Sequence, residues 1–99
     1  MLIVAGLIHV KPEAHAVAVE AMSEVMAETR KEAGCISYTF SPDFTDPGLF
    51  HLFEEWESQE QLSAHFEAPH IAAFRRRQPE FVARPGEVKI YIVSESRPL

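Results

Sequence analysis

The stretch from residue 49 to residue 77 constrains the fold most, because a strand pattern leads directly into a helix start. Residues 49–56 (LFHLFEEW) are mostly apolar or aromatic and include no Gly or Pro, which favours a strand. Ser58 is a typical N-cap, and Gln61 three residues later completes a capping box, in which each side chain satisfies a backbone donor of the other residue. Pro69 disfavours helical geometry in the residue before it and suits the first turn of a new helix. The stretch therefore predicts a strand followed by two short helical segments.

The rest of the chain alternates between strand and helix patterns in the same way. Apolar residues at steps of three and four predict a long helix that Pro12 starts and Gly34 caps. In the strand that follows, Ile36, Tyr38 and Phe40 are expected to share one face. The expected elements are strands at 2–10, 35–40, 49–56 and 87–94, helical segments at 12–33 and 58–77, and loops at 41–48 and 79–86.

This order, β-α-β-β-α-β, predicts a ferredoxin-like α+β fold in one domain over residues 1–99. Right-handed crossovers place the helices on one face of a four-stranded antiparallel sheet. The opposite face is left uncovered, yet the first strand carries apolar residues on both sides: Leu2, Val4 and Ile8 on one, and Ile3, Ala5 and Leu7 on the other. A large exposed apolar face usually marks an interface. The sequence therefore predicts a homodimer in which two sheets pack face to face as an α+β barrel.

Composition and charge argue against several functions. The net charge of −6 disfavours a nucleic-acid partner, which needs a basic face. The single cysteine, Cys35, excludes an internal disulfide and gives no sign of a zinc site, which suits a reducing cytoplasm. No apolar run approaches the roughly 20 residues that cross a bilayer, and Met1–Val10 lacks the charged start of a secretion signal. We therefore expect a cytoplasmic protein with no membrane or nucleic-acid partner.

Four side chains stand out as candidates for chemistry: Glu54, Trp56, His65 and His70. Glu54 lies two residues before Trp56 and therefore shares its strand face. The two histidines are five residues apart, whereas helical metal sites favour a spacing of three or four, so no metal site is expected. A histidine, with an unperturbed pKa of about 6.5, suits a general base at neutral pH. A surface or packing role remains open for each histidine, and a core role for Trp56.

Several blocks of the sequence match a known family in order and spacing. They are Glu32-Ala-Gly34-Cys35 leading to Tyr38, Phe53-Glu54-Glu55-Trp56-Glu57-Ser58, Leu62-Ser-Ala-His65-Phe66, Ala68-Pro69-His70 and the aromatic Phe74. On these blocks the chain resembles the antibiotic biosynthesis monooxygenase (ABM) domain family over essentially its whole length, and within it the small quinol-monooxygenase group. The resemblance implies a dimeric α+β barrel with a pocket between each sheet and its helices.

The resemblance also implies an activity and a site. Similar members oxidise quinols and polycyclic phenols with O₂ and use no flavin, metal or other cofactor, because the deprotonated substrate itself passes an electron to O₂. By this likeness the catalytic residues are His65 as base or substrate-orienting group, with Trp56 and Tyr38 as pocket walls and hydrogen-bonding groups. The implied substrate-binding residues are His70, Phe74, Glu54 and Phe40. The chain departs from haem-degrading relatives, because its first strand has no Asn.

Two other functions fit the same barrel and pocket. One is an isomerase or lyase of a small hydroxylated or phosphorylated carbonyl compound, with His65 as proton shuttle and Arg75–Arg77 near a phosphate. The arginine run has a second reading, as cations that complement the dipole at a helix C-terminus. The other function is a non-catalytic, stress-related dimer that binds an apolar ligand. Turnover without oxygen would favour the first alternative, and ligand binding that survives His65→Ala without turnover would favour the second.

Overall fold

The structure is a computed structural model that describes all 99 residues. Four strands and three α-helices follow one another along the chain, with a short 3₁₀ turn before the first helix and another after the last. The bounds are β1 Leu2–Val10, η1 Pro12–Ala14, α1 His15–Thr29, β2 Cys35–Pro42, β3 Leu49–Trp56, α2 Gln59–Phe66, α3 Pro69–Arg77, η2 Gln78–Glu80 and β4 Val82–Ile92.

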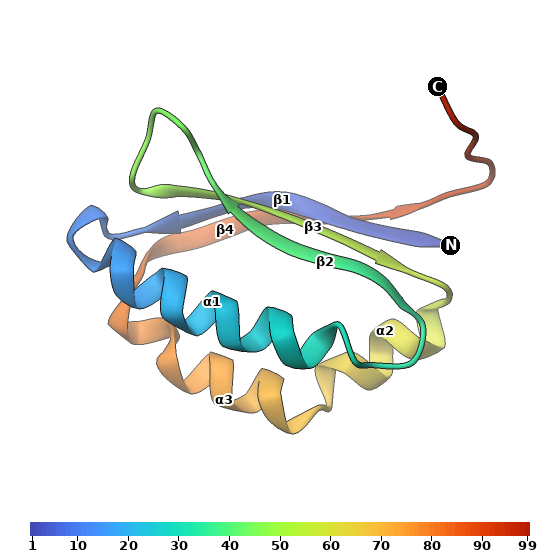
Figure 1. Cartoon of the computed structure of the whole chain (residues 1–99), viewed down its shortest axis with the longest axis horizontal. Helices are drawn as coiled ribbons and strands as arrows, with labels where there is room; N and C mark the ends of the chain where they lie inside the picture. Colours follow the sequence, from blue (N-terminus) through green and yellow to red (C-terminus); the bar gives the residue numbers. More distant parts are fainter.

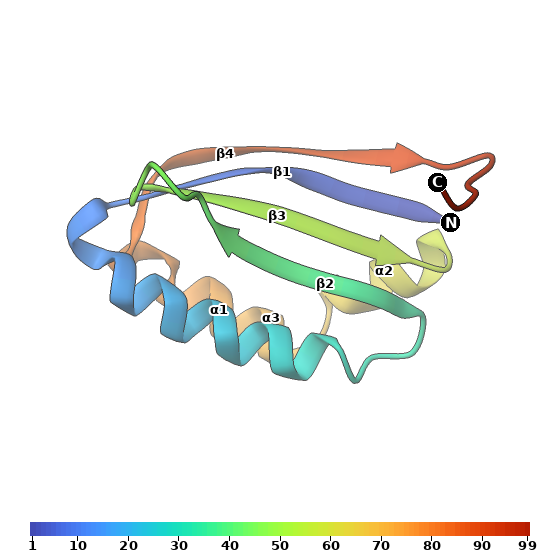
Figure 2. The ribbon, with the colours of Figure 1, turned by 45° about the horizontal axis from the view of Figure 1, so that its top comes forward.

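The strands form one sheet in the order β2-β3-β1-β4, with every neighbouring pair antiparallel. All three α-helices lie on the same face of this sheet, and the other face carries no helix (Figures 1 and 2). The predicted ferredoxin-like α+β fold is confirmed.

The first helix is shorter than the sequence pattern suggests. It is preceded by η1 and ends at Thr29, where Arg30 is the C-cap, so the prediction that Gly34 caps a helix reaching residue 33 was wrong. Residues 30–34 turn instead, and Gly34 has a φ of +81°, a conformation that favours glycine. A Cβ at Gly34 would also lie only 2.2 Å from the side chain of Gln61. This turn carries Glu32 toward α2 and α3.

Both edge strands depart from the simple alternating pattern. In β2 the pairing shifts between Cys35 and Ser37, so Ile36 is the extra residue of a bulge and is half exposed, and it does not share the buried face of Tyr38 and Phe40. The strand β4 begins at Val82 and not at residue 87, and so contains Pro85 and Gly86, which had predicted a loop. An edge strand tolerates both residues where its pairing shifts, as it does here opposite β1.

The capping of the second helix agrees with the sequence in part. The Ser58 hydroxyl accepts a hydrogen bond from the Gln61 backbone N–H at 3.4 Å, as an N-cap does. The Gln61 side chain, however, accepts from the Ser58 hydroxyl and not from the Ser58 backbone, so the capping box is not reciprocal. The predicted break is confirmed, because α2 ends at Phe66 and Pro69 starts α3.

The core lies between the sheet and the helices. Its most enclosed large side chains are Trp56, Phe50, Phe81, Met22 and Leu62. Burying a large apolar side chain of this kind stabilises a fold by roughly 1.5–3 kcal/mol. On the helix-free face, by contrast, Phe53 and Tyr91 are 43% and 50% exposed. No helix of the fold combines the length and apolar character needed to cross a membrane.

Candidate functional site

A cavity of about 160 Å³ lies between the sheet and helices α2 and α3, and we call it the inner cavity. Every strand and both helices contribute to its walls. The lining residues are Ile8, Tyr38, Phe40, Leu52, Glu54, His65, Phe66, Ile71, Phe74, Arg75, Gln78, Phe81 and Val82. Mostly apolar walls with a few polar groups are typical of a small-molecule site.

Two histidines share one carboxylate oxygen beside this cavity. Glu32 Oε2 lies 2.6 Å from His65 Nδ1 and 2.7 Å from His70 Nε2. The three residues come from the turn after α1, from α2 and from the start of α3. An ionised carboxylate only accepts hydrogen bonds, so His65 carries its proton on Nδ1 and His70 carries one on Nε2. Glu32 thus fixes the tautomer of both rings.

His65 is the enclosed member of this group, with 2% of its surface exposed. Its ring packs against Trp56 and Tyr38, with centroids 4.9 and 5.3 Å away. Burial lowers the pKa of His65, and the hydrogen bond to Glu32 opposes this shift only in part. The lowered pKa favours the neutral imidazole at neutral pH, and the bond from Nδ1 to Glu32 is the only hydrogen bond that the ring makes within the chain, so Nε2 has no partner there. A neutral ring with a free nitrogen at a cavity wall can accept a proton.

Glu54 is a second buried ionisable group in the inner cavity. It is 5% exposed, and its Oε1 accepts a hydrogen bond from Trp56 Nε1 at 2.8 Å. Burial raises the pKa of Glu54 to about 7, although the Trp56 bond favours the charged form. Near neutral pH this carboxyl can therefore donate a proton, while His65 can accept one. Two ionisable groups whose environments shift their pKa in opposite directions suit acid and base roles.

Aromatic side chains make up much of the remaining wall. Tyr38 is 3% exposed, and burial raises the pKa of its phenol far above the usual value, so it stays protonated. Phe40 contacts Tyr38 edge to face and Phe74 at a tilt, with centroids 5.7 Å apart in each pair. Phe74 also packs on Phe81. These rings form an apolar part of the cavity wall.

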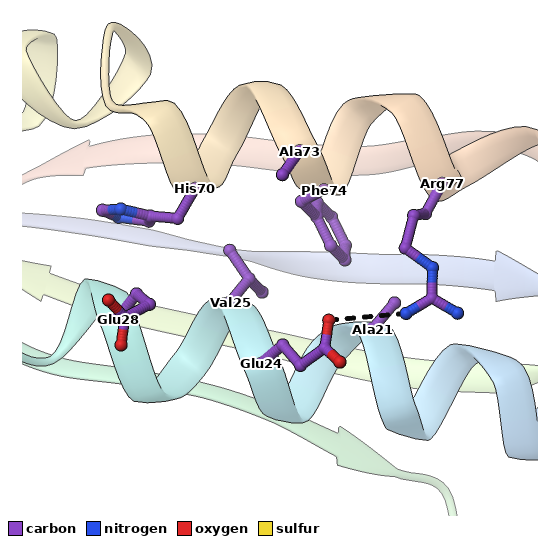
Figure 3. Close-up of a pocket in the computed structure, with 8 residues that line it drawn as sticks. All are labelled: Ala21, Glu24, Val25, Glu28, His70, Ala73, Phe74 and Arg77. Atoms are coloured by element: carbon purple, nitrogen blue, oxygen red, sulfur yellow. Dashed lines mark hydrogen bonds and ion pairs between the residues drawn. The ribbon is translucent and has the colours of Figure 1, made fainter.

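A second hollow, the interhelical cleft, lies between α1 and α3 and has a volume of about 210 Å³ (Figure 3). Ala21, Glu24, Val25 and Glu28 line it from α1, and His70, Ala73, Phe74 and Arg77 from α3. Its charged side chains form ion pairs, Glu24 with the partly exposed Arg77 and Glu28 with Lys31 outside the cleft. Although it is the larger hollow, it holds no buried acid or base, so we place the chemistry in the inner cavity.

The structure brings most of the predicted site residues together. Five of the seven line the inner cavity: Tyr38, Phe40, Glu54, His65 and Phe74. Trp56 is fully buried and does not line the cavity. Its indole N–H donates to Glu54, and its ring packs against His65. His70 lines the interhelical cleft and reaches the site through Glu32.

Glu32 is the residue that sequence reasoning missed as part of the site. It lies 33 residues from His65 and 38 from His70, so no local spacing connects them. The only sequence feature that pointed to Glu32 was its position in the block that matches the family, two residues before Gly34.

Comparison with known proteins assigns the chain to a family. The family model of antibiotic biosynthesis monooxygenases matches residues 1–77, so the chain belongs to the antibiotic biosynthesis monooxygenase family. The predicted family resemblance is confirmed.

Individual relatives agree with this assignment. An uncharacterized protein of Synechocystis is 36% identical over 98 residues, which span 99% of this chain and 67% of that protein. A Mycobacterium tuberculosis protein, provisionally named a monooxygenase, is 30% identical over 80 residues, or 81% of this chain and 78% of its own. The solved structure of that protein superposes with a TM-score of 0.87 over 98% of both chains. A provisionally named antibiotic biosynthesis monooxygenase from Nitrosomonas europaea, 22% identical, shares the fold with a TM-score of 0.89 over 96% of this chain and all of its own.

Proposed function

We propose that the protein is a cofactor-independent monooxygenase that oxidises quinol-like or polycyclic phenolic substrates with O₂ in the inner cavity. The observation that carries the proposal is His65, a buried imidazole that lines the inner cavity and whose Nδ1 is bound by Glu32, which leaves Nε2 without a partner in the chain. Glu32 holds the ring much as the carboxylate of a catalytic triad holds its histidine. Family membership supports the class of reaction.

In the proposed reaction His65 Nε2 takes a proton from the substrate hydroxyl or from an acidic ring CH₂. The resulting anion is electron-rich enough to pass one electron to O₂, and recombination gives a peroxide on the ring carbon. Loss of water converts this carbon to C=O. One oxygen atom enters the product and the other leaves as water, and the substrate supplies all four electrons, so no external reductant is needed.

The other cavity groups assist this sequence. The protonated Glu54 donates to the departing oxygen, and the Tyr38 hydroxyl, which stays protonated, is a donor for the substrate anion. The rings of Phe40 and Phe74 exclude water, which would otherwise intercept the anion or the peroxide.

An isomerase or lyase is the second candidate, and Arg75 favours it. Arg75 lines the inner cavity, whereas Arg77 is held by Glu20, Glu24 and Glu80. A guanidinium at the cavity suits a phosphate or carboxylate on the substrate. This reading predicts turnover under anaerobic conditions, which the oxygenase reading forbids.

We further propose that the protein acts as a homodimer in the cytoplasm. The alternating burial of β3 and the register of the sheet place Phe53 on β3 and Tyr91 on β4 on the helix-free face, and both are exposed in the single chain. Covering that face with a second copy would bury them. Light scattering should give twice the chain mass, and Phe53→Glu should give the mass of one chain. The single free thiol, Cys35, suits a reducing compartment.

The test is oxygen uptake by metal-stripped protein with naphthols, anthrones and hydroquinones, measured against autoxidation without protein. We expect saturable uptake that falls by about 10²-fold or more in His65→Ala, because general-base catalysis contributes 10²–10⁴-fold. His15→Gln is the matched control, since His15 bonds to Pro47 far from the cavity. Uptake equal to the protein-free rate with every substrate would contradict the proposal. Ligand binding without turnover would then favour a binding protein.

A further inference from the structure

The Glu32 cluster has the composition of a metal site, which the spacing of the two histidines alone does not suggest. Glu32, His65 and His70 each offer one ligand atom, and these atoms all lie within 4.8 Å of one another. They come from three separate segments that the fold brings together. Two imidazoles and one carboxylate form a donor set typical of Zn²⁺ and of Fe²⁺.

The side chains must adjust to hold an ion, because the ligand atoms, which lie within 4.8 Å of one another, must come to an even spacing. The two N–O distances are now 2.6 and 2.7 Å, as befits hydrogen bonds. Ligand atoms about 2.0–2.1 Å from a tetrahedral ion lie roughly 3.3 Å apart. Each nitrogen must therefore move away from Glu32 Oε2 by roughly 0.7 Å, a shift that side-chain rotation in His70 and Glu32 can supply. Both side chains are partly exposed, at 21% and 17%.

The interhelical cleft gives the cluster a route to solvent. His70 lines this cleft, and the carboxylates of Glu24 and Glu28 lie across it on α1 (Figure 3). The cleft also has room for the water molecules that would complete the coordination of an ion held by only three protein ligands.

We propose that Glu32, His65 and His70 bind one divalent transition-metal ion per chain. Zn²⁺ fits the donor set and a tetrahedral arrangement, with water as the fourth ligand. The ion enters from the interhelical cleft and takes the place of the two hydrogen-bonded protons between the imidazoles and Glu32.

Metal binding changes what His65 presents to the inner cavity. In the metal-free protein Nδ1 holds the proton and Nε2 is free. When Nδ1 binds the ion, the proton of the neutral ring moves to Nε2, so the base becomes a hydrogen-bond donor. His70 exchanges its proton from Nε2 to Nδ1 in the same way, and no proton is lost overall. A filled site would therefore switch off turnover that needs His65 as the base. This consequence rests on the proposed function, whereas the binding site itself does not.

The experiment titrates the full chain with Zn²⁺ by calorimetry, and with Co²⁺ by visible absorption, before any activity is measured. We expect one ion per chain and a loss of affinity of roughly 100-fold or more in His70→Ala and in Glu32→Gln. The double variant His9→Asn, His51→Asn is the matched control, because each of those histidines also contacts a carboxylate but has no second histidine beside it. It should bind the ion as the unaltered chain does.

Three results would overturn the metal site: no binding, unchanged affinity in His70→Ala, or affinity lost in the surface double variant. Circular dichroism confirms that each variant is folded, and His70→Gln replaces His70→Ala if the latter does not fold. Oxygen uptake with and without Zn²⁺ then separates the two proposals. Binding without any turnover to inhibit would contradict the oxygenase and leave the metal site standing.

Discussion

Two hollows lie on either side of helix α3, and they use the same kinds of charged residue in different ways. The inner cavity encloses Glu54 and His65, each at most 5% exposed, among aromatic rings. In the interhelical cleft Glu24 is 66% exposed and Arg77 is 27% exposed, and the two pair at 3.4 Å. Charges interact far more strongly in a dry interior than in solvent, so the enclosed groups have shifted pKa values and the exposed pair contributes little. We therefore propose the inner cavity as the site because it encloses ionisable groups, and not because of its volume.

The Glu32 carboxylate joins the two hollows. Through one oxygen it holds His65 at the inner cavity and His70 at the interhelical cleft. A substitution that removes Glu32 should therefore change turnover in the inner cavity strongly. A substitution that leaves the bond from Glu32 to His65 intact should change it less. Four pairs of substitutions test the contrast between the two hollows.

The largest effect is expected for Glu32→Ala. Without the carboxylate, His65 loses the hydrogen bond that fixes its tautomer, and base-dependent turnover should fall by about 10²–10³-fold. His70→Ala leaves the bond from Glu32 to His65 intact and should cost about tenfold or less. Steady-state oxygen uptake measures both. Equal losses in the two variants would mean that the inner cavity and the interhelical cleft do not differ as described.

The next effect is a pH-dependent gain of stability in Glu54→Gln. Because burial raises the pKa of Glu54 from 4.5 to about 7, the folded chain binds this proton more tightly than the unfolded chain. The free energy of unfolding therefore falls as the pH rises from about 4.5 to about 7, by about 3 kcal/mol in total. Gln can still accept the Trp56 bond and has no charge to bury.

Denaturant unfolding at pH 5 and pH 8 measures this effect. Glu54→Gln should be more stable than the unaltered chain by up to about 3 kcal/mol at pH 8, and close to it at pH 5. Glu57→Gln, an exposed carboxylate just after the same strand, is the control and should show no such difference between the two pH values. An identical gain at both pH values would show that the Glu54 carboxyl does not titrate as described.

A smaller effect is expected for Phe74→Ala, which removes a wall shared by both hollows. Truncating a fully buried Phe costs about 3–5 kcal/mol, and the half-buried Phe74 should cost about 2 kcal/mol. The variant should also admit larger aromatic substrates, because the two hollows merge. Phe44→Ala, at a fully exposed position, is the matched control and should change stability by less than about 0.5 kcal/mol. Denaturant unfolding and the KM for substrates of increasing size test both statements.

The smallest effect is expected for Arg77→Ala in the interhelical cleft. Arg77 contacts Glu20, Glu24 and Glu80, whose side chains are all more than half exposed. Such pairs are screened by solvent and salt, so the melting temperature should fall by only a few degrees, and by less in high salt. Arg76→Ala is the control, since Arg76 forms no ion pair and should change nothing. A large loss that persists in high salt would mean that the cleft is not a solvated surface.

Local signals account for the parts of the fold that the sequence predicts well. Ser58 acts through its hydroxyl on the backbone three residues later, and Pro69 acts through its ring on the residue before it, so the start of α2 and the break before α3 follow from neighbouring residues alone. The same local rules were wrong for Pro85 and Gly86, because an edge strand with shifted pairing accommodates residues that break other strands. They were also wrong for Gly34, whose positive φ serves the turn and not the helix end.

The residues of the candidate site also divide into those that the sequence predicts and those that it does not. Alternation along the strands and the family likeness select Tyr38, Glu54 and His65, which the structure places at one cavity. The contact of Glu32 with both histidines depends on the packing of α2 and α3 against the turn after α1. No spacing in the sequence encodes that packing.

The most direct test of the central claim is nuclear magnetic resonance of the histidine ring nitrogens in the uniformly ¹⁵N-labelled, metal-free chain. Long-range ¹H–¹⁵N correlations distinguish the two neutral tautomers and the doubly protonated ring. For His65 at pH 7 we predict a neutral ring with its proton on Nδ1 and Nε2 free. A proton on Nε2, or on both nitrogens, would contradict the assignment of His65 as the base that Glu32 orients.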